Sequence, residues 1–418
     1  MVKIIHTGDL HYSADTLSEV ERCMSSVLSA VDATVDAVVI GGDTTDHRLD
    51  AHTPAFHALA SRIREIASQV PTLLLQGTFS HEPPGMLRTL GLMHDNIFVA
   101  DRIGQVALTN DGLWVPAPTG YAFGPSELEA LHRDHSVKAL FSCLPVANPA
   151  AVLALRGGTA EAAVSNAQAL GDATAAVLAG WGSINNHARE LGIPTIGVSH
   201  GTTKESRSEH GVPMHSMDHE YTTGMLFAAG CSAFMLNHIH LHQQWDVNGR
   251  RVAYSGSLPC LHYGETGDKV FLVWQVATTH AEFEARPSGA QQFADFAFHG
   301  VDNIDRVLAE LRLADVRGKK VRVRVTLPIT ARDGFDADTV RAALADAIEV
   351  KVEPIYVPVT RVRAEGVGEA THHDRLRLWA ESTGLEERLP ELEAGLSAAL
   401  ANDAAAIVEQ IMRTTAIA

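Results

Sequence analysis

Short apolar runs alternate with helical patterns along the first part of the chain. Five such runs are each followed by glycine or polar residues: Ile4–Ile5, Val38–Ile40, Thr72–Leu75, Thr195–Val198 and Ala233–Leu236. Apolar runs of this length, bounded by turn residues, predict buried strands. Between the first three runs, apolar side chains recur at helical spacing and predict helices over 17–31 and 54–70. Strands and helices in alternation predict an α/β fold with right-handed crossovers.

The pattern changes near residue 286. A helix over 304–313, strands over 321–325 and 353–357, and a helix over 337–348 between these strands predict a small α+β unit. From Thr371 onward the chain reads as helical. Its leucines predict one apolar helix face: Leu385, Leu389, Leu392, Leu396 and Leu400. We therefore predict three parts, covering residues 1–285, 286–366 and 367–418.

Aspartate and histidine follow the predicted strand ends. These residues are Asp9, His11, Asp43, His81, His200, His238 and His240. In α/β folds, ligands bind beyond the carboxyl ends of the strands. Mixed imidazole and carboxylate ligands suit manganese or iron better than magnesium, which prefers an all-oxygen shell. The spacing therefore predicts a metal site shared by five strand ends.

Composition narrows the class of protein. The formal net charge of −17 argues against a polycation, so nucleic-acid binding would need local basic patches or metal ions. No window of about 18 apolar residues predicts a membrane-spanning helix. The N-terminus enters a predicted strand at once, which leaves no room for a signal peptide. The four cysteines lack metal-binding spacing and read as reduced thiols. We expect a cytoplasmic protein with no membrane partner.

The order of these motifs resembles that of the calcineurin-like metallophosphoesterases. Gly8-Asp9-Leu10-His11, Gly41-Gly42-Asp43, His81-Glu82, Ser199-His200-Gly201 and His238-Ile239-His240 follow one another in the family order. The later segments Tyr254–Leu258, Tyr263–Glu265 and Lys269–Leu272 resemble the end of the nuclease domain in SbcD-type DNA repair exonucleases. The resemblance implies two sheets flanked by helices in residues 1–285. It also implies a capping domain over 286–366 and C-terminal helices that bind an ATPase over 367–418.

The resemblance also implies a ligand set for two Mn²⁺ ions, with Fe²⁺ or Mg²⁺ as alternatives. Asp9, His11 and His240 would hold one ion, and His200 and His238 the other. Asp43 would bridge the two ions. Metal ions about 3.5–4 Å apart can clamp a phosphodiester and activate a water molecule.

The catalytic group implied by the resemblance is His81, acting as a general acid or orienting the leaving group. Asp46 or His47 could support it from the loop of the second motif.

Two positions depart from the family pattern. The family has an asparagine ligand before the catalytic histidine, whereas this chain has Ser80 there when aligned on His81 and Glu82. Ser80, Thr78 or a water molecule could fill that position. Asn237 replaces the glycine that usually precedes His238, and asparagine tolerates left-handed backbone angles.

The function implied is that of a manganese-dependent DNA exo/endonuclease, the nuclease subunit of a complex with an SbcC-type ATPase. The family also implies a homodimer formed by helices near residues 54–70. A basic cluster in the capping domain would contact the DNA backbone: Arg317, Lys319, Lys320, Arg322 and Arg324. The alternative for this cluster is a solvated strand face balanced by acidic residues. The alternatives for the whole protein are a stand-alone phosphodiesterase on small phosphoesters and a scaffold subunit with impaired catalysis.

Overall fold

The computed structural model describes residues 1–146, 167–208, 221–265, 267–300, 304–357 and 371–401. Two large sheets form its first part. The strands of one are β1 (Val2–Thr7), β2 (Ala37–Ile40), β3 (Thr72–Leu75), β4 (Ile97–Ala100), β12 (Val270–Val276) and β13 (Ala281–Pro287). Those of the other are β5 (Gly104–Thr109), β6 (Trp114–Pro116), β7 (Val137–Leu144), β8 (Thr195–His200), β9 (Ala233–Asn237), β10 (Gln243–Val247) and β11 (Arg250–Tyr254). The strand orders are β13-β12-β1-β2-β3-β4 and β10-β11-β9-β8-β7-β5-β6.

Helices connect the parallel strands of both sheets. They are α1 (Leu17–Ser29), α2 (Pro54–Ala67), α3 (Met86–Gly91), α4 (Pro125–His135), α7 (Ala167–Glu190) and α8 (Thr223–Ala228). Strands β1 to β4 are parallel neighbours, and α1 and α2 link them as the hydrophobic pattern predicts. At the start of α2, the Thr53 side chain accepts a hydrogen bond from the Phe56 amide, and Pro54 occupies the first turn.

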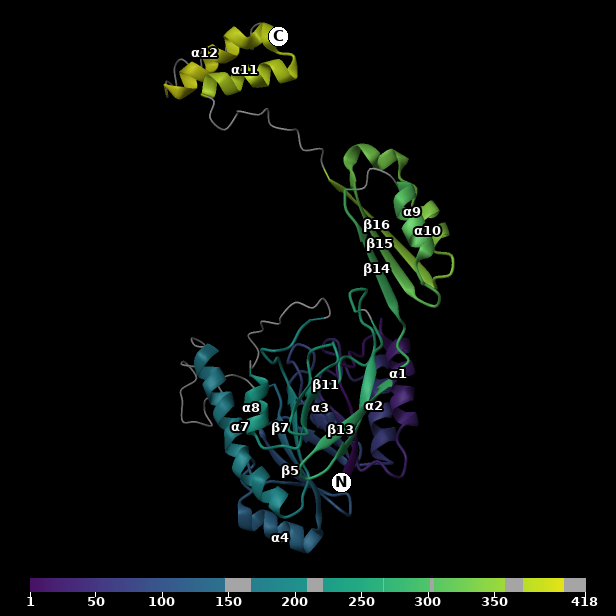
Figure 1. Cartoon of the computed structure of the whole chain (residues 1–418), viewed down its shortest axis with the longest axis vertical. Coiled ribbons are helices and arrows are strands. Elements are labelled where there is room, and N and C mark those ends of the chain that lie inside the picture. The colour runs from purple at the N-terminus through teal and green to yellow at the C-terminus, as the bar shows by residue number, and fades with distance from the viewer. Residues whose placement is uncertain (147–166, 209–220, 266, 301–303, 358–370, 402–418) are drawn as a thin grey trace. The chain divides into compact units, whose positions relative to one another are not determined.

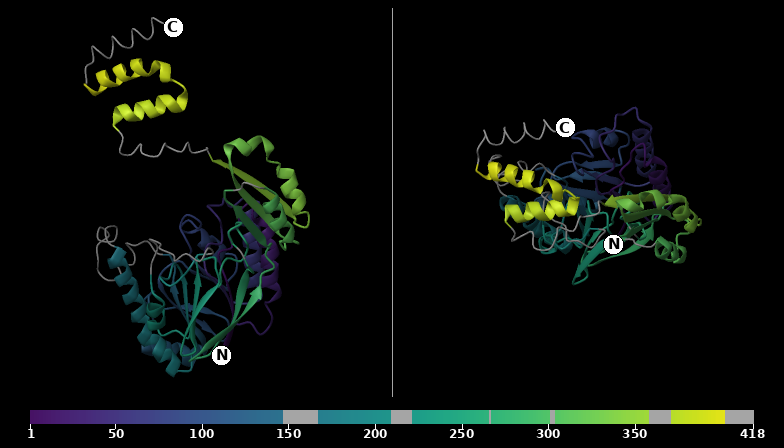
Figure 2. Two further views of the ribbon diagram at one scale, coloured as in Figure 1. Left: turned by 45° about the horizontal axis from the view of Figure 1, so that its top comes forward. Right: turned by 90° about the horizontal axis from the view of Figure 1, so that it is seen from above.

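The core has layers because the central strands β1, β2 and β3 of the first sheet bury both faces. Ile5 and Ile40 pack with residues of α1 and α2 in one cluster. Ile4 and Val39 point the other way and pack with residues of the second sheet. On the far face of the second sheet, β9 packs against α7 and α8. Figure 1 shows α1 and α2 on one side of the sheets and α7 on the other, and the left view of Figure 2 shows the same separation. This confirms the predicted mixed α/β architecture with sheets flanked by helices.

The layering brings strand ends of the two sheets together. Within the first sheet, the Asp9 amide donates to the Gly42 carbonyl at 2.9 Å. Within the second, β8 and β9 pair in parallel so that His200 lies opposite Asn237. Between the sheets, the His200 ring bonds the Gly41 carbonyl at 2.8 Å. The carboxyl ends of β1, β2, β8 and β9 therefore meet at one place.

A third, smaller sheet follows β13. It consists of β14 (Phe293–Phe298), β15 (Lys320–Pro328) and β16 (Glu349–Val357), in that order, with α9 (Ile304–Leu313), the 3-10 helix η1 (Ile329–Gly334) and α10 (Ala337–Ala343) between its strands. Along β15 the valines are buried and the basic residues alternate with them. The unit is α+β, as predicted, although α10 ends at Ala343 and not at residue 348.

Two helices follow at the end of the described chain, α11 (His372–Thr383) and α12 (Leu389–Leu400), with the 3-10 helix η2 (Glu386–Arg388) between them. The predicted leucine stripe is therefore shorter than the sequence indicates. Gly384 ends α11 in a left-handed conformation, and Leu385 lies outside both α-helices. The leucines from Leu389 to Leu400 share α12.

By internal contacts the chain divides into two compact units, residues 1–325 with 336–354, and residues 326–335 with 355–418. The boundaries predicted at residues 285 and 366 stay predictions. In the described parts of the chain, no helix combines the length and the apolar character needed to span a bilayer.

Candidate metal centre

Four of the predicted ligands adopt a backbone conformation that is uncommon outside glycine. The φ angles are +48° at Asp9, +51° at His11, +51° at Asp43 and +99° at His238. Such conformations cost on the order of 1–3 kcal/mol each and cluster at functional sites. They follow directly after the ends of β1, β2 and β9, so the turns at these strand ends determine where the ligand side chains lie.

The first cluster consists of Asp9, His11 and His240. One ligand atom from each lies within 4.8 Å of the others. The Nε2 atoms of His11 and His240 are 3.2 Å apart. That spacing fits two nitrogens bound to one ion at about 2.1 Å each, which would lie roughly 3 Å apart. Asp9 and His11 are buried and His240 is half-buried.

The second cluster consists of Asp43, His200 and His238, with the same limit of 4.8 Å between ligand atoms. The His200 Nε2 lies 3.2 Å from an Asp43 carboxylate oxygen. The rings of His200 and His238 meet edge to face, with centroids 5.1 Å apart. The structure thus places the six predicted aspartate and histidine ligands in two buried groups that could each hold a metal ion.

Hydrogen bonds fix the tautomers of two ligand histidines. The Nδ1 of His200 faces the Gly41 carbonyl, which can only accept, so Nδ1 carries the proton. The Nδ1 of His240 likewise donates to the Glu265 carboxylate at 2.8 Å. In their neutral form, both rings therefore present an Nε2 lone pair, which can bind a metal. The donor set fits the expected metal ions.

Thr78, and not Ser80, reaches the second cluster from the third motif. The Thr78 amide donates to Asp43 at 2.6 Å, and its hydroxyl lies 3.2 Å from Asp43 Oδ2 and 3.4 Å from His200 Nε2. Ser80 is exposed. Of the three candidates for the missing asparagine ligand, the structure brings the Thr78 hydroxyl next to the other ligands.

His81 lies beside the first cluster. Its ring is 4.9 Å from the His11 ring, and His11, Asp46 and His81 form a third group of possible ligands. The His81 Nδ1 donates to the backbone carbonyl of Asp46, which leaves Nε2 as the nitrogen that can exchange a proton. The Asp46 carboxylate is 3.5 Å from His11 Nδ1 and 3.4 Å from the neighbouring His47. Asp46 therefore holds His81 through its backbone and faces His11 through its side chain.

The electrostatics of the site reflect burial and opposite charge. Burial disfavours the charged form of the His200 ring, but the adjacent Asp43 carboxylate outweighs it and raises the pKa of His200. Burial, together with the nearby His240, lowers the pKa of His11 to about 4. Burial also opposes ionisation of Glu265, yet His240 and Lys269 lower the pKa of Glu265 to about 2. The site is a concentration of carboxylate charge that a cation would stabilise.

The comparisons with known proteins leave the family open. The chain matches no protein-family model and no curated protein. Among solved structures it is similar to GAP50, the anchor in the inner membrane complex of Plasmodium, at 10% identity and a TM-score of 0.38, over 69% of this chain and 85% of that chain. It is also similar to the phosphopantetheinyl hydrolase (PptH) from Mycobacterium tuberculosis, at 12% identity and a TM-score of 0.30, over 61% of this chain and 90% of that chain. At these TM-scores the likenesses carry no conclusion.

Two buried carboxylates support the site without having a role in the sequence-based prediction. Glu82 accepts hydrogen bonds from the Thr44 amide and from the Gly77 amide, both at 2.6 Å, and so ties the second motif to the third. Burial, and then the nearby Asp43, raise the pKa of Glu82 to about 7. Glu265 orients His240. Both lie within the motifs quoted above, but only the tertiary contacts reveal what they hold.

The basic cluster of the small sheet is largely paired. Arg322 makes two hydrogen bonds to Asp295, at 3.0 and 2.7 Å, and Arg324 donates to the same carboxylate at 2.8 Å. Lys320 pairs with Glu349 at 3.0 Å, and Lys319 lies 3.8 Å from Asp315. Arg317 is exposed. These ion pairs match the alternative of a balanced strand face, and contact of this cluster with DNA stays a prediction.

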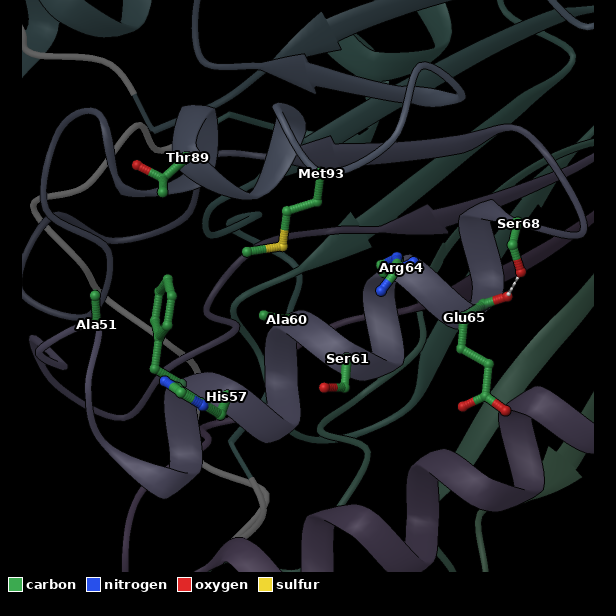
Figure 3. Close-up of a pocket in the computed structure, with 10 residues that line it drawn as sticks. Ala51, His57, Ala60, Ser61, Arg64, Glu65, Ser68, Thr89 and Met93 are labelled. Carbon is green, nitrogen blue, oxygen red and sulfur yellow. Dashed lines mark hydrogen bonds between the residues drawn. The ribbon is translucent and has the colours of Figure 1, made fainter.

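A separate cavity of about 600 Å³ runs along α2 and contains none of the predicted site residues. Figure 3 shows Met93 pointing over Ala60 of α2, with Arg64 and Glu65 further along the same helix. The cavity lies on the helix for which the resemblance implies a second subunit.

Proposed function

We propose that this chain is a calcineurin-like metallophosphoesterase that hydrolyses phosphodiester bonds. One observation carries the proposal. Two groups, each of one aspartate and two histidines, meet at strand ends from two facing sheets, and His81 stands beside one of them. Separate strands do not need to end in such a set unless the set binds something.

Two bound divalent ions would polarise the phosphodiester and activate a water molecule for attack. Asp9, His11 and His240 would hold one of them. Asp43, His200 and His238 would hold the other, with the Thr78 hydroxyl near them. The mixed nitrogen and oxygen donors favour Mn²⁺, with Fe²⁺ or Mg²⁺ as alternatives.

His81 would protonate the leaving group or orient it. The Asp46 carbonyl holds Nδ1, so the ring cannot turn freely and Nε2 is the atom that gives or takes a proton. A general acid at this place protonates the departing oxygen, a role worth roughly 10²–10⁴-fold in rate.

For the substrate we propose DNA, as in the SbcD-type nuclease subunits. Support comes from Glu265 and Lys269, which belong to the segment that resembles those enzymes. Glu265 orients the ligand His240, and Lys269 donates to the His240 carbonyl at 3.0 Å. This segment therefore contacts a candidate metal ligand, which supports the proposal.

Two surfaces fit the partners that the resemblance implies. The leucines of α12 are half-buried or exposed, and 47% of Trp379 on α11 is exposed, so this hairpin offers an apolar face to the coiled coil of an SbcC-type ATPase. The groove along α2 offers a concave surface to a second copy of the chain.

A second candidate, a phosphodiesterase on small phosphoesters, draws support from the small sheet. Because Asp295 pairs with both Arg322 and Arg324 and offsets one of their two charges, this sheet presents less positive charge to a DNA backbone than its sequence indicates.

One assay separates these candidates. Purified protein with Mn²⁺ is tested on linear double-stranded DNA and on a chromogenic phosphodiester, each with and without an SbcC-type ATPase, and the variant His81→Ala serves as the control. Cleavage of both substrates, with ATPase-stimulated DNA cleavage, is expected. Cleavage of the chromogenic substrate alone under all conditions would favour the small-phosphoester enzyme. Failure to cleave either substrate would favour the remaining alternative, a scaffold subunit with impaired catalysis.

A further inference from the structure

Asn237, the last residue of β9, makes hydrogen bonds to three residues of the site through its buried side chain. Its Oδ1 lies 2.7 Å from His6 Nε2. Its Nδ2 donates to Asp9 Oδ2 at 3.1 Å and to the Ser255 hydroxyl at 2.8 Å. The amide thus links β1, the end of β9 and the turn after β11.

The chemistry of the partners sets the direction of the amide. Asp9 is an acceptor when ionised, so the amide nitrogen and not the oxygen must face it. The amide oxygen then faces His6, which must carry its proton on Nε2. Burial lowers the pKa of His6 to about 4, so the ring is neutral and has one such proton to give. The reverse orientation would place two oxygens against each other at Asp9.

Two glycines make room for this amide. A side-chain carbon at Gly8 would overlap the Asn237 amide nitrogen, and one at Gly41 would overlap its oxygen. Gly8 directly precedes Asp9, and Gly41 lies two residues before Asp43. The Asn237 side chain therefore fills the space between the ends of β1 and β2, where the first and second metal motifs begin.

We propose that Asn237 is a positioning residue for Asp9, which holds the carboxylate in the orientation that serves the first metal site. The inference rests on the proposed metal function. The backbone supports the same carboxylate, since the His238 amide donates to both Asp9 oxygens, at 3.1 and 3.0 Å. The Asn237 amide adds a side-chain donor that is itself held in place by His6 and Ser255. In the family that the sequence resembles, glycine usually stands here, so this device belongs to this chain.

The test compares three variants with the wild type by their binding of Mn²⁺ alone. Asn237→Gly removes the amide and restores the usual residue, and Ser255→Ala removes one of the two groups that hold the amide. Asn185→Asp is the matched control, because Asn185 is also fully buried and hydrogen-bonded, to Ser142 and the Ala229 carbonyl, but belongs to α7 and not to the metal site. Bound Mn²⁺ is followed by calorimetric titration and by the electron paramagnetic resonance of the coupled ion pair. Thermal unfolding without metal reports folding.

We expect Asn237→Gly to weaken Mn²⁺ binding at one of the two sites by about 10–100-fold, as losses of supporting partners typically do. The coupled signal would then give way to that of a single ion. Ser255→Ala should weaken the same site by roughly two- to tenfold, the effect of one hydrogen bond. Asn185→Asp should lower the unfolding temperature and leave both ions in place.

Two results would overturn the inference alone. The first is that the wild type binds two ions and that the Asn237→Gly and Ser255→Ala variants bind both ions as tightly as the wild type does. The second is that Asn237→Gly weakens Mn²⁺ binding at both sites and that the control Asn185→Asp weakens it equally. Asn237 would then contribute only to packing. If Asn237→Gly does not fold, Ser255→Ala decides by the same criteria. A wild type that binds no Mn²⁺ would overturn the proposed function and the inference with it.

Discussion

Glu265 offers the sharpest test of how the site is held, because several donors share its two oxygens, and His262 Nε2 also lies 3.4 Å from Oε1. Oε1 accepts from His240 Nδ1 at 2.8 Å. Oε2 accepts from the Leu261 amide at 2.9 Å and pairs with Lys269 Nζ at 3.0 Å. The Glu265 side chain is fully buried, and 8% of the Lys269 side chain is exposed. Solvent can therefore do little to replace these bonds.

The substitution Glu265→Gln keeps the shape and removes one acceptor. If the amide oxygen faces Leu261 and Lys269, the amide nitrogen faces the His240 N–H, and the ring must move its proton to Nε2 and lose the metal-binding lone pair. If the amide is reversed, Lys269 is left buried without its counter-charge. Removing one partner of a buried ion pair costs about 3–5 kcal/mol. Because glutamine still offers one acceptor, we expect a loss near 3 kcal/mol of unfolding free energy.

The assay measures stability by urea denaturation without metal and Mn²⁺ affinity by titration. We expect Glu265→Gln to weaken the first metal site by about 10–100-fold. Glu21→Gln is the control, because Glu21 accepts bonds from Tyr12 and Arg62 at 2.7 and 3.0 Å and contacts no ligand. It should lower stability and leave Mn²⁺ binding unchanged. If Glu265→Gln bound Mn²⁺ as tightly as the wild type, Glu265 would not set the tautomer of His240.

Three further substitutions test the division of roles within the third motif. His81→Ala should lower the cleavage rate by roughly 10²–10⁴-fold and leave the Mn²⁺ content unchanged, measured by rate assay and elemental analysis, because in the proposed mechanism His81 gives a proton and is not a metal ligand. Thr78→Ala should weaken Mn²⁺ binding at the second metal site by about tenfold in a titration, because the Thr78 hydroxyl lies next to Asp43 and His200. The control Ser80→Ala, at an exposed position, should bind Mn²⁺ as the wild type does.

Each of these predictions has an outcome that would contradict it. A rate loss below about threefold in His81→Ala would remove His81 as the catalytic group, and a loss of metal would move it into the ligand set. Weaker binding in Ser80→Ala with normal binding in Thr78→Ala would reverse the assignment of the neutral oxygen ligand.

The strand and helix pattern of the first 100 residues was readable because each element buries a face with its own period. Ile4 and Ile5 point to different core clusters, as adjacent residues of a buried strand must. The ligands were readable because parallel strands deliver their last residues to one edge. These features are local in sequence, so the sequence alone could predict them.

The features that could not be predicted from the sequence depend on contacts between residues that are distant in the chain. Asp295 neutralises Arg322 from the neighbouring strand β14, and nothing in the run of basic residues indicates it. Thr78, and not Ser80, lies next to Asp43 because the loop after β3 brings the Thr78 amide and hydroxyl to the Asp43 carboxylate.

We propose a centre of two metal ions in which Asp43 binds both. Asp43 groups with His200 and His238, and its charge also acts on His11 of the other cluster. The most direct measurement is the Mn²⁺ content of the wild type and of Asp43→Ala, by elemental analysis after equilibration with Mn²⁺ and removal of free ions. We expect about two ions per wild-type chain and a loss at both sites in the variant. An Asp43→Ala protein that keeps two ions and full activity would contradict it.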